Sequence, residues 1–253
     1  MSGKDQPAPG FYGKLPGLGD FVSRRLPVDF TQPWDLWLRE SLVSSQTQMG
    51  EAWLDIYLTS PLWRFVLSSG VAGQNGWAGV LMPSVDRVGR YFPFTLACPL
   101  PAGTDPVCLL CEPAWLERAE ELALSGLEDD WNIDVFDAEV VALGAPQPVG
   151  LAADAASAPG APMRHNAWRA SAVSPADVRQ VIPGLLGRAL NQMYCAYSLW
   201  WSCGSERVAP SLLTCQGLPP ADGYAALIGG DWSGNGWWEL GVGMPSPQPQ
   251  DPA

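Results

Sequence analysis

The polar residues with the clearest chemical potential lie in one short loop, Ser84-Val-Asp-Arg-Val-Gly-Arg90, which carries a hydroxyl, a carboxylate and two guanidinium groups. Arginine pairs with aspartate through bidentate hydrogen bonds, so one interpretation is a buried ion-pair network that fixes Gly-rich loops on a sheet. The other interpretation is a site for a small anion or a protein partner. The charged and hydroxyl residues considered for this constellation are Lys14, Asp20, Arg24, Ser84, Asp86, Arg87 and Arg90.

A hydrolase that uses Ser84, Asp86 and Lys14 is a third alternative, which a cleft with a perturbed lysine would favour. Nothing in the spacing of these residues requires it. The single histidine, His165, lies beside Arg164 after an Ala/Pro-rich stretch, which is a poor position for the base of a catalytic triad. We therefore predict no catalytic residue.

Two further patterns could bind a ligand. Cys108 and Cys111 form a lone CxxC pair with no second pair and no nearby histidine, so we expect buried thiols, and neither a metal nor a cofactor. The C-terminal tryptophans Trp232, Trp237 and Trp238 could stack on a sugar, which keeps a carbohydrate-binding module open as another class. The alternative for these rings is core packing.

The charge of the chain is negative and uneven. The 253 residues carry a formal net charge of −12, which disfavours binding to nucleic acid or to anionic lipid through bulk charge. Residues 105–139 hold eleven acidic side chains against one basic one, Arg118. A helix that opens at Pro113 places Glu117, Glu120 and Glu121 opposite its apolar face. This face is predicted to be either a solvated surface or a contact for a basic partner.

The elements that position these residues follow from hydrophobic spacing and turn signals. We expect strands at 10–14, 62–67, 76–82, 91–100 (broken by Pro93), 168–173, 196–202 and 211–215. Helices are expected from Thr31, at 51–58, from Pro113, from Asp130, at 175–194 and after Pro220. The predicted organisation is a tail (1–9), a first α/β region (10–144) with acidic helices at 105–143, a linker (145–163), a C-terminal α/β part packed on the first (164–245) and a second tail (246–253).

Secretion and membrane insertion are not expected. The first ten residues lack the apolar segment of a secretory signal, and no apolar stretch approaches the roughly 20 residues of a membrane helix. The hydrophobic fraction of 47% excludes a disordered chain. These observations predict a folded cytoplasmic protein.

Four motifs resemble the TagF (ImpM) family of type VI secretion accessory proteins. They are Gly10-Phe-Tyr-Gly-Lys-Leu-Pro-Gly-Leu-Gly-Asp-Phe-Val-Ser-Arg-Arg-Leu-Pro27, Trp34-Asp-Leu-Trp-Leu38, Pro61-Leu-Trp-Arg-Phe65 and Met82-Pro-Ser-Val-Asp-Arg-Val-Gly-Arg-Tyr-Phe-Pro93. Their order and spacing over residues 10–100 make the resemblance specific. Beyond residue 100 it rests on Ser198-Leu-Trp-Trp-Ser202 and Gly217-Leu-Pro219 alone.

The resemblance implies an α/β (α+β) fold with a mostly antiparallel sheet flanked by helices, similar to longin or profilin. It also implies a cytoplasmic, non-enzymatic negative regulator that acts after translation by engaging the forkhead-associated scaffold of the type VI secretion system. It supplies no catalytic residue. The seven residues of the constellation carry over only as motif positions of unknown role.

Overall fold

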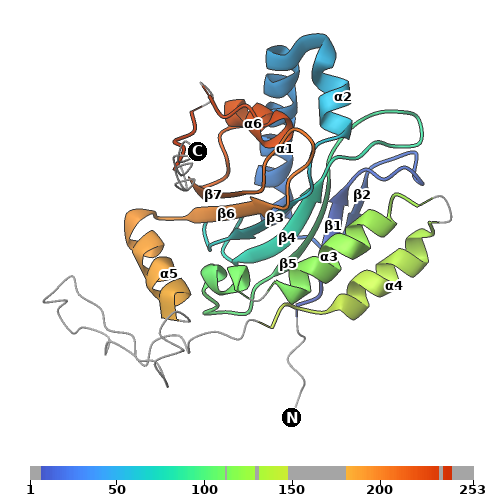
Figure 1. Ribbon diagram of the computed structural model, residues 1–253. Helices are drawn as coiled ribbons and strands as arrows, with labels where there is room; N and C mark the ends of the chain where they lie inside the picture. Colours follow the sequence, from blue (N-terminus) through green and yellow to red (C-terminus); the bar gives the residue numbers. More distant parts are fainter. Residues whose placement is uncertain (1–6, 112, 129–130, 148–180, 234–235, 241–253) are drawn as a thin grey trace, which may run out of the picture.

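The computed structural model describes residues 7–111, 113–128, 131–147, 181–233 and 236–240, and within them one antiparallel sheet dominates the molecule (Figure 1). Seven strands pair in the order β2-β1-β5-β4-β3-β6-β7. The predicted mixed α/β class with an antiparallel sheet is therefore confirmed, while the likeness to longin or profilin stays a prediction. The strands are β1 Gly10–Gly13, β2 Val22–Arg24, β3 Trp63–Leu67, β4 Trp77–Met82, β5 Phe94–Pro99, β6 Tyr197–Ser202 and β7 Ser211–Gln216.

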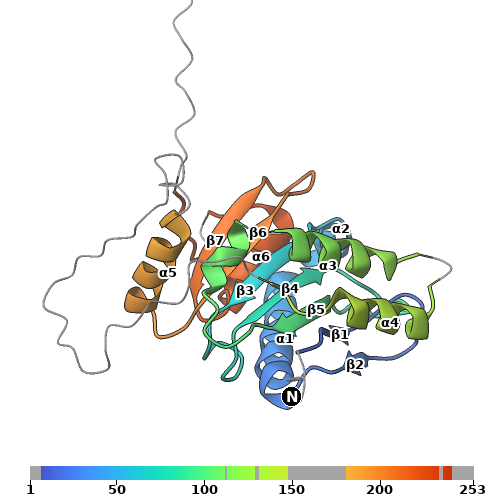
Figure 2. The same ribbon diagram turned by 90° about the horizontal axis from the view of Figure 1, so that it is seen from below.

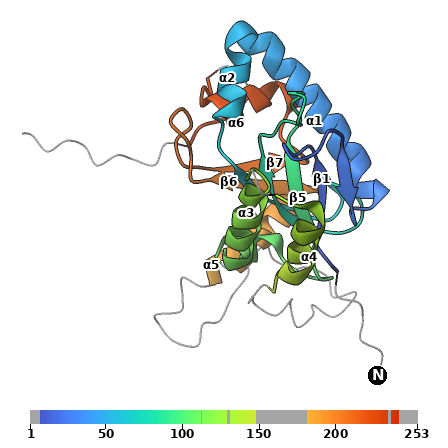
Figure 3. The same ribbon diagram turned by 90° about the vertical axis from the view of Figure 1, so that its right-hand side faces the viewer.

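Helices cover both faces of this sheet (Figure 3). One face carries α1 (Val28–Met49), α2 (Trp53–Leu58) and α6 (Tyr224–Gly229), with short 3-10 turns at Gly50–Ala52 and Ala221–Gly223. Figure 2 looks onto the other face, which is covered by α3 (Ala114–Ser125) and α4 (Ile133–Leu143). The 3-10 turn η2 (Pro106–Leu110) and α5 (Ile182–Met193) pack against each other beside them.

Each face of the sheet has its own hydrophobic core, because successive side chains of a strand point to opposite faces. On β3, Phe65 joins the α1 core and Val66 joins the α3 core. The α1 core is aromatic: the rings of Trp34 and Trp200 stack with centroids 5.8 Å apart. The indole N–H of Trp34 donates to Thr95 Oγ1 at 2.8 Å, so this buried polar group is satisfied.

The segments before and after the predicted linker share the same sheet. Strand β6 pairs with β3 in antiparallel register, with Phe65 opposite Trp200. The predicted strand at 168–173, the beginning of the helix predicted at 175–194, His165 and most of the linker lie outside the described residues.

Three predicted boundaries are wrong for identifiable reasons. Helix α1 begins at Val28, because the N–H of Thr31 already donates to Pro27 O at 2.9 Å and Phe30 is buried. Strand β5 begins at Phe94, after Pro93, which has no N–H for a strand ladder. Helix α4 begins at Ile133, since the Asn132 side chain accepts from the next helical amides and caps it.

Candidate functional site

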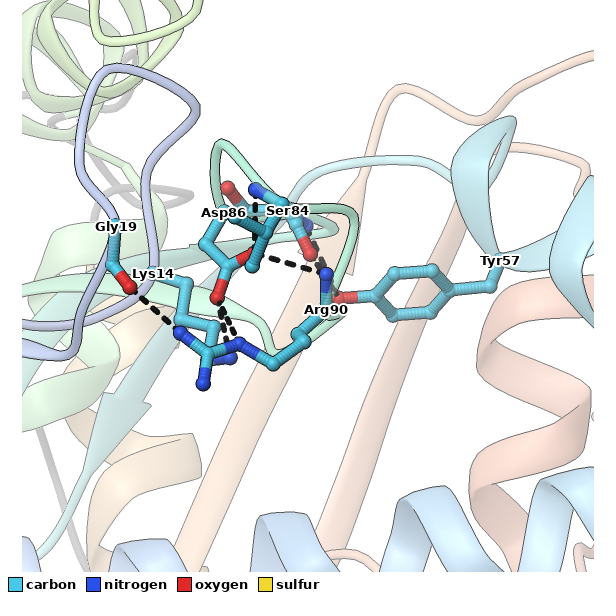
Figure 4. A network of polar contacts seen from close by, with 7 residues as sticks. Lys14, Gly19, Tyr57, Ser84, Asp86 and Arg90 are labelled. Atoms are coloured by element: carbon cyan, nitrogen blue, oxygen red, sulfur yellow. Dashed lines mark hydrogen bonds and ion pairs between the residues drawn. The ribbon is translucent and has the colours of Figure 1, made fainter.

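The candidate site is built around the buried carboxylate of Asp86, which accepts four hydrogen bonds (Figure 4). Its Oδ2 accepts from Lys14 Nζ at 2.8 Å and from Arg90 Nε at 2.6 Å. Its Oδ1 accepts from the backbone amides of Val88 at 3.0 Å and Arg90 at 2.9 Å. Lys14, which directly follows β1, is 6% exposed and Asp86 is 2% exposed, so their ion pair is buried.

This environment fixes the charge state of Asp86. Burial alone would raise the pKa of the carboxyl group, because it disfavours the charged form. The hydrogen bonds from Lys14, Arg90 and the amide of Val88 outweigh that effect and hold the pKa of Asp86 well below its usual range. Asp86 is therefore an anion that is already fully engaged by the protein itself.

The loop follows from its local sequence. Residues 86–90 turn back on themselves, with the N–H of Asp86 donating to Arg90 O at 2.9 Å. Gly89 supplies the left-handed backbone, φ +84°, that this turn requires. Val85 and Tyr91 form a β-bridge at the base of the loop. The aspartate, the glycine and the second arginine thus occupy the positions that close the turn.

A tyrosine from α2 clamps the beginning of the loop. The hydroxyl of Tyr57 donates to Ser84 O and accepts from Ser84 N, each at 3.0 Å (Figure 4). Burial raises the pKa of Tyr57 well above its ordinary value, so the hydroxyl keeps its proton. The sequence gives no signal for this contact, which joins residues 27 positions apart.

Two hydrogen bonds, one from a backbone amide and one from a side chain, tie the loop to backbone carbonyls of the preceding loop, between β1 and β2. The N–H of Arg87 donates to Leu18 O at 3.0 Å, and Arg90 Nη2 donates to Gly19 O at 2.6 Å. The predicted network that fixes two Gly-rich loops is therefore present, with Lys14, Asp86 and Arg90 as its ionic members.

The remaining predicted residues lie apart from these ion pairs. Arg87 is exposed, and its side chain forms no hydrogen bond or ion pair with the described residues. Asp20 and Arg24 are also exposed, and the same holds for their side chains within the part of the chain that the structure describes. The structure thus joins only part of the predicted constellation.

Comparison with known proteins identifies the family. The model described as "TagF N-terminal domain, Type VI secretion system-associated" matches residues 10–143, more than half of the chain. The chain belongs to the TagF family. It is also similar to the crystal structure of PA0076 from Pseudomonas aeruginosa PAO1, with 42% identity and a TM-score of 0.76 over 94% of this chain and 100% of that one. A comparison with curated proteins found no match.

The TagF match contains every residue of the predicted constellation, and also contacts that the sequence did not reveal. Tyr12 donates its hydroxyl to Asp35 Oδ1 at 2.5 Å, and Arg39 pairs with Asp35 Oδ2 at 2.5 Å. The guanidinium of Arg39 lies 5.9 Å from the Phe92 ring, which packs on Phe21 with centroids 4.7 Å apart. The first, second and fourth motifs of this TagF chain therefore meet beside the loop.

Arg25 is a second residue that sequence reasoning missed. It has a positive φ of 58°, donates through Nε to Pro9 O at 2.7 Å and pairs with Asp137 on α4 at 2.6 Å. Its neighbour Arg24 stood in the predicted constellation instead. Arg25 lies directly after β2, and the sequence gives no signal for its positive φ, a backbone conformation that residues other than glycine rarely adopt.

Among the described residues around the loop, Ser84 is not paired with a base. Ser84 Oγ is buried and has no hydrogen-bond partner among the described residues. The ammonium of Lys14 is bonded to Asp86. A serine nucleophile needs a base within hydrogen-bond reach, and this arrangement does not supply one to Ser84.

The two other patterns considered as ligand sites, the CxxC pair and the C-terminal tryptophans, do not form such sites among the described residues. Cys108 is buried in η2, where burial raises the pKa of its thiol, whereas Cys111 is exposed. Within the described ranges no group of three or more His, Cys, Asp or Glu side chains could hold a metal ion. Trp232 and Trp237 pack edge to face and are partly buried, so only Trp238, 97% exposed, stands free.

An arginine of the sheet binds part of the acidic face of α3. Arg64 of β3 pairs with Glu120 at 2.7 Å and approaches Glu117 at 3.9 Å. Glu117 and Glu121 are exposed, whereas Glu120 is half-buried. Of the three predicted glutamates, Glu120 is therefore a bridge between α3 and the sheet.

Proposed function

We propose that this TagF-family chain is a non-enzymatic, post-translational negative regulator of bacterial type VI secretion, which acts in the cytoplasm by binding the forkhead-associated scaffold protein of that system. The family match supports the link to type VI secretion. The observation that carries the non-enzymatic part is the internal pairing of Lys14 with Asp86, which leaves Ser84 without a base.

A protein is the kind of partner that fits this chain. Its net charge of −12 disfavours nucleic acid and anionic lipid, which need a cationic field. Among the described residues no helix has the length and apolarity needed to cross a membrane. The loop region presents arginine and aromatic side chains, which are typical of protein interfaces.

Complementation tests the regulatory role. A strain that lacks the gene is expected to secrete a type VI effector at a raised level, and the intact chain is expected to repress it. The Ser84→Ala variant should repress equally well, because its hydroxyl forms no hydrogen bond with the described residues. A folded Ser84→Ala protein that no longer represses would refute the non-enzymatic proposal and favour the hydrolase alternative.

Direct binding tests the partner. The purified chain and the purified forkhead-associated scaffold should form a complex in biolayer interferometry, and cell fractionation should recover the chain with the cytoplasm. Unchanged transcript levels of the secretion genes in the deletion strain would agree with regulation after translation. A purified scaffold that does not bind the wild-type chain would contradict the proposed partner.

A further inference from the structure

The outer rim of the loop combines exposed cations with exposed apolar side chains. Val88 is 67% exposed and Phe21 is 41% exposed. Arg87 is exposed, and the Arg90 side chain is 57% exposed. We call these four residues, Phe21, Arg87, Val88 and Arg90, the arginine rim.

The two guanidinium groups of the rim retain unused donors. Arg87 forms no side-chain hydrogen bond with the described residues. Arg90 uses Nε for Asp86 and Nη2 for Gly19 O, while its Nη1 has no partner in the described ranges. A guanidinium binds a carboxylate with strong, charge-assisted hydrogen bonds. The rim is therefore suited to a carboxylate from a partner.

The rim is also held in place before any partner arrives. Asp86 fastens the turn with four hydrogen bonds, and the backbone of Arg87 is bonded to Leu18. The Phe21 ring packs edge to face on the Phe92 ring, and Lys14 Nζ lies 5.2 Å from the centroid of the Phe21 ring. A preorganised surface loses less conformational entropy on binding than a mobile one.

We propose that the arginine rim is the surface on which an acidic segment of the scaffold docks, with an apolar side chain of that segment seated on Phe21 and Val88. This inference rests on the proposed function. Charge complementarity supports it: the chain concentrates eleven of its 26 acidic residues at 105–139, whereas the rim carries two arginines and has Asp20 as its exposed acidic neighbour in the chain. Aromatic residues and arginine are also enriched in the cores of protein interfaces.

Matched charge changes test the surface, with affinity for the purified scaffold measured by biolayer interferometry. Arg87→Glu should weaken binding about tenfold or more, because it removes an attraction and adds a repulsion. Arg24→Glu is the control, since it makes the same change at an exposed arginine that forms no hydrogen bond with the described residues. It should change the affinity less than about twofold.

A gain of affinity separates the proposal from mere destabilisation. Asp20 is exposed and adjoins Phe21, so it opposes an acidic partner. Asp20→Asn should strengthen binding about two- to fivefold, the range of one surface charge interaction. Val88→Ser should weaken binding without changing its dependence on salt.

Competition with charged polymers shows whether the scaffold binds a positively or a negatively charged surface of this chain. Polyglutamate should compete with the scaffold for the wild-type chain, and it should compete less for Arg87→Glu. Inhibition by polylysine alone would overturn the proposal and favour the acidic face of α3. Equal affinities of wild type and Arg87→Glu for the scaffold would overturn the rim and leave the proposed function standing. A scaffold that does not bind wild type would refute the proposed partner, and the rim inference would fall with it.

Discussion

Removing one oxygen atom, in Tyr57→Phe, tests whether the clamp on the loop holds the site in shape. The hydroxyl accepts from Ser84 N and donates to Ser84 O, both at 3.0 Å, in a buried place. The Ser84 carbonyl would keep a second bond, because it also accepts from Phe92 N at 3.0 Å. The amide of Ser84 would lose the only acceptor that the described residues give it.

The size of the effect follows from that single orphaned amide. A buried donor without a partner costs about 1–3 kcal/mol, so we expect the free energy of unfolding to fall by about 2 kcal/mol. For a chain of this length, that change lowers the melting temperature by about 4–8 °C. Hydrogen exchange at the Ser84 amide should accelerate in the same variant, because a loosened loop opens more often.

Tyr224→Phe provides the control. Tyr224 is buried, and its hydroxyl forms no hydrogen bond with the described residues. The same chemical change there should alter the free energy of unfolding by less than about 0.5 kcal/mol. Equal stability of both variants, with the Ser84 amide still protected in Tyr57→Phe, would show that the tyrosine does not hold the loop.

Two further predictions concern charge. Because the folded state lowers the pKa of Asp86 below its ordinary 3.8, its stabilising contribution is complete above about pH 4 and is lost as the pH falls through the folded pKa. Lys14→Met should raise the pKa of Asp86 in the folded state. The difference in melting temperature between wild type and Lys14→Met should therefore shrink as the pH is lowered below 4. A constant difference from pH 7 to pH 3 would contradict a stabilising ion pair. On α3, Glu120→Lys should lower the free energy of unfolding by about 1–3 kcal/mol, because it removes the ion pair with Arg64 of the sheet. Changing both Glu117 and Glu121 to Lys should leave folding intact. This double variant should associate more slowly with the scaffold at low salt only if a basic scaffold surface contacts this face.

The sequence predicts most of the fold because the sheet is made of strands with strong local signals. The apolar runs that became β3, β4, β6 and β7 are bounded by turn residues, and each was predicted within two residues of its observed limits. Strand β2 was missed. It has only three residues, Val22–Arg24, and two of them are exposed, so its existence depends on pairing with β1. Such pairing has no local signature in the sequence.

The sequence predicts the charged residues of the candidate site, but it does not predict the hydrogen bonds from Tyr57 that hold the loop. Lys14 and Asp86 are 72 positions apart. Their opposite charges and their positions in two Gly-rich loops were enough to group them in one predicted constellation. The sequence does not identify Tyr57 as a site residue, because its spacing in a helix indicates only a core position. Its hydroxyl acquires a role through the tertiary packing of α2 against the loop.

The spacing within the fourth motif has a physical explanation, which distinguishes the residues that close the turn from those whose side chains are not needed for it. An aspartate at 86 can accept from the amides two and four residues later, provided that residue 89 adopts a positive φ, which favours glycine. The guanidinium at 90 then reaches the same carboxylate. Residues 87 and 88 use only their backbones to close the turn, so their side chains are free to vary without breaking it. The exposed side chains of Arg87 and Val88 are therefore not needed to close the turn, and they remain open to the contact proposed for the arginine rim.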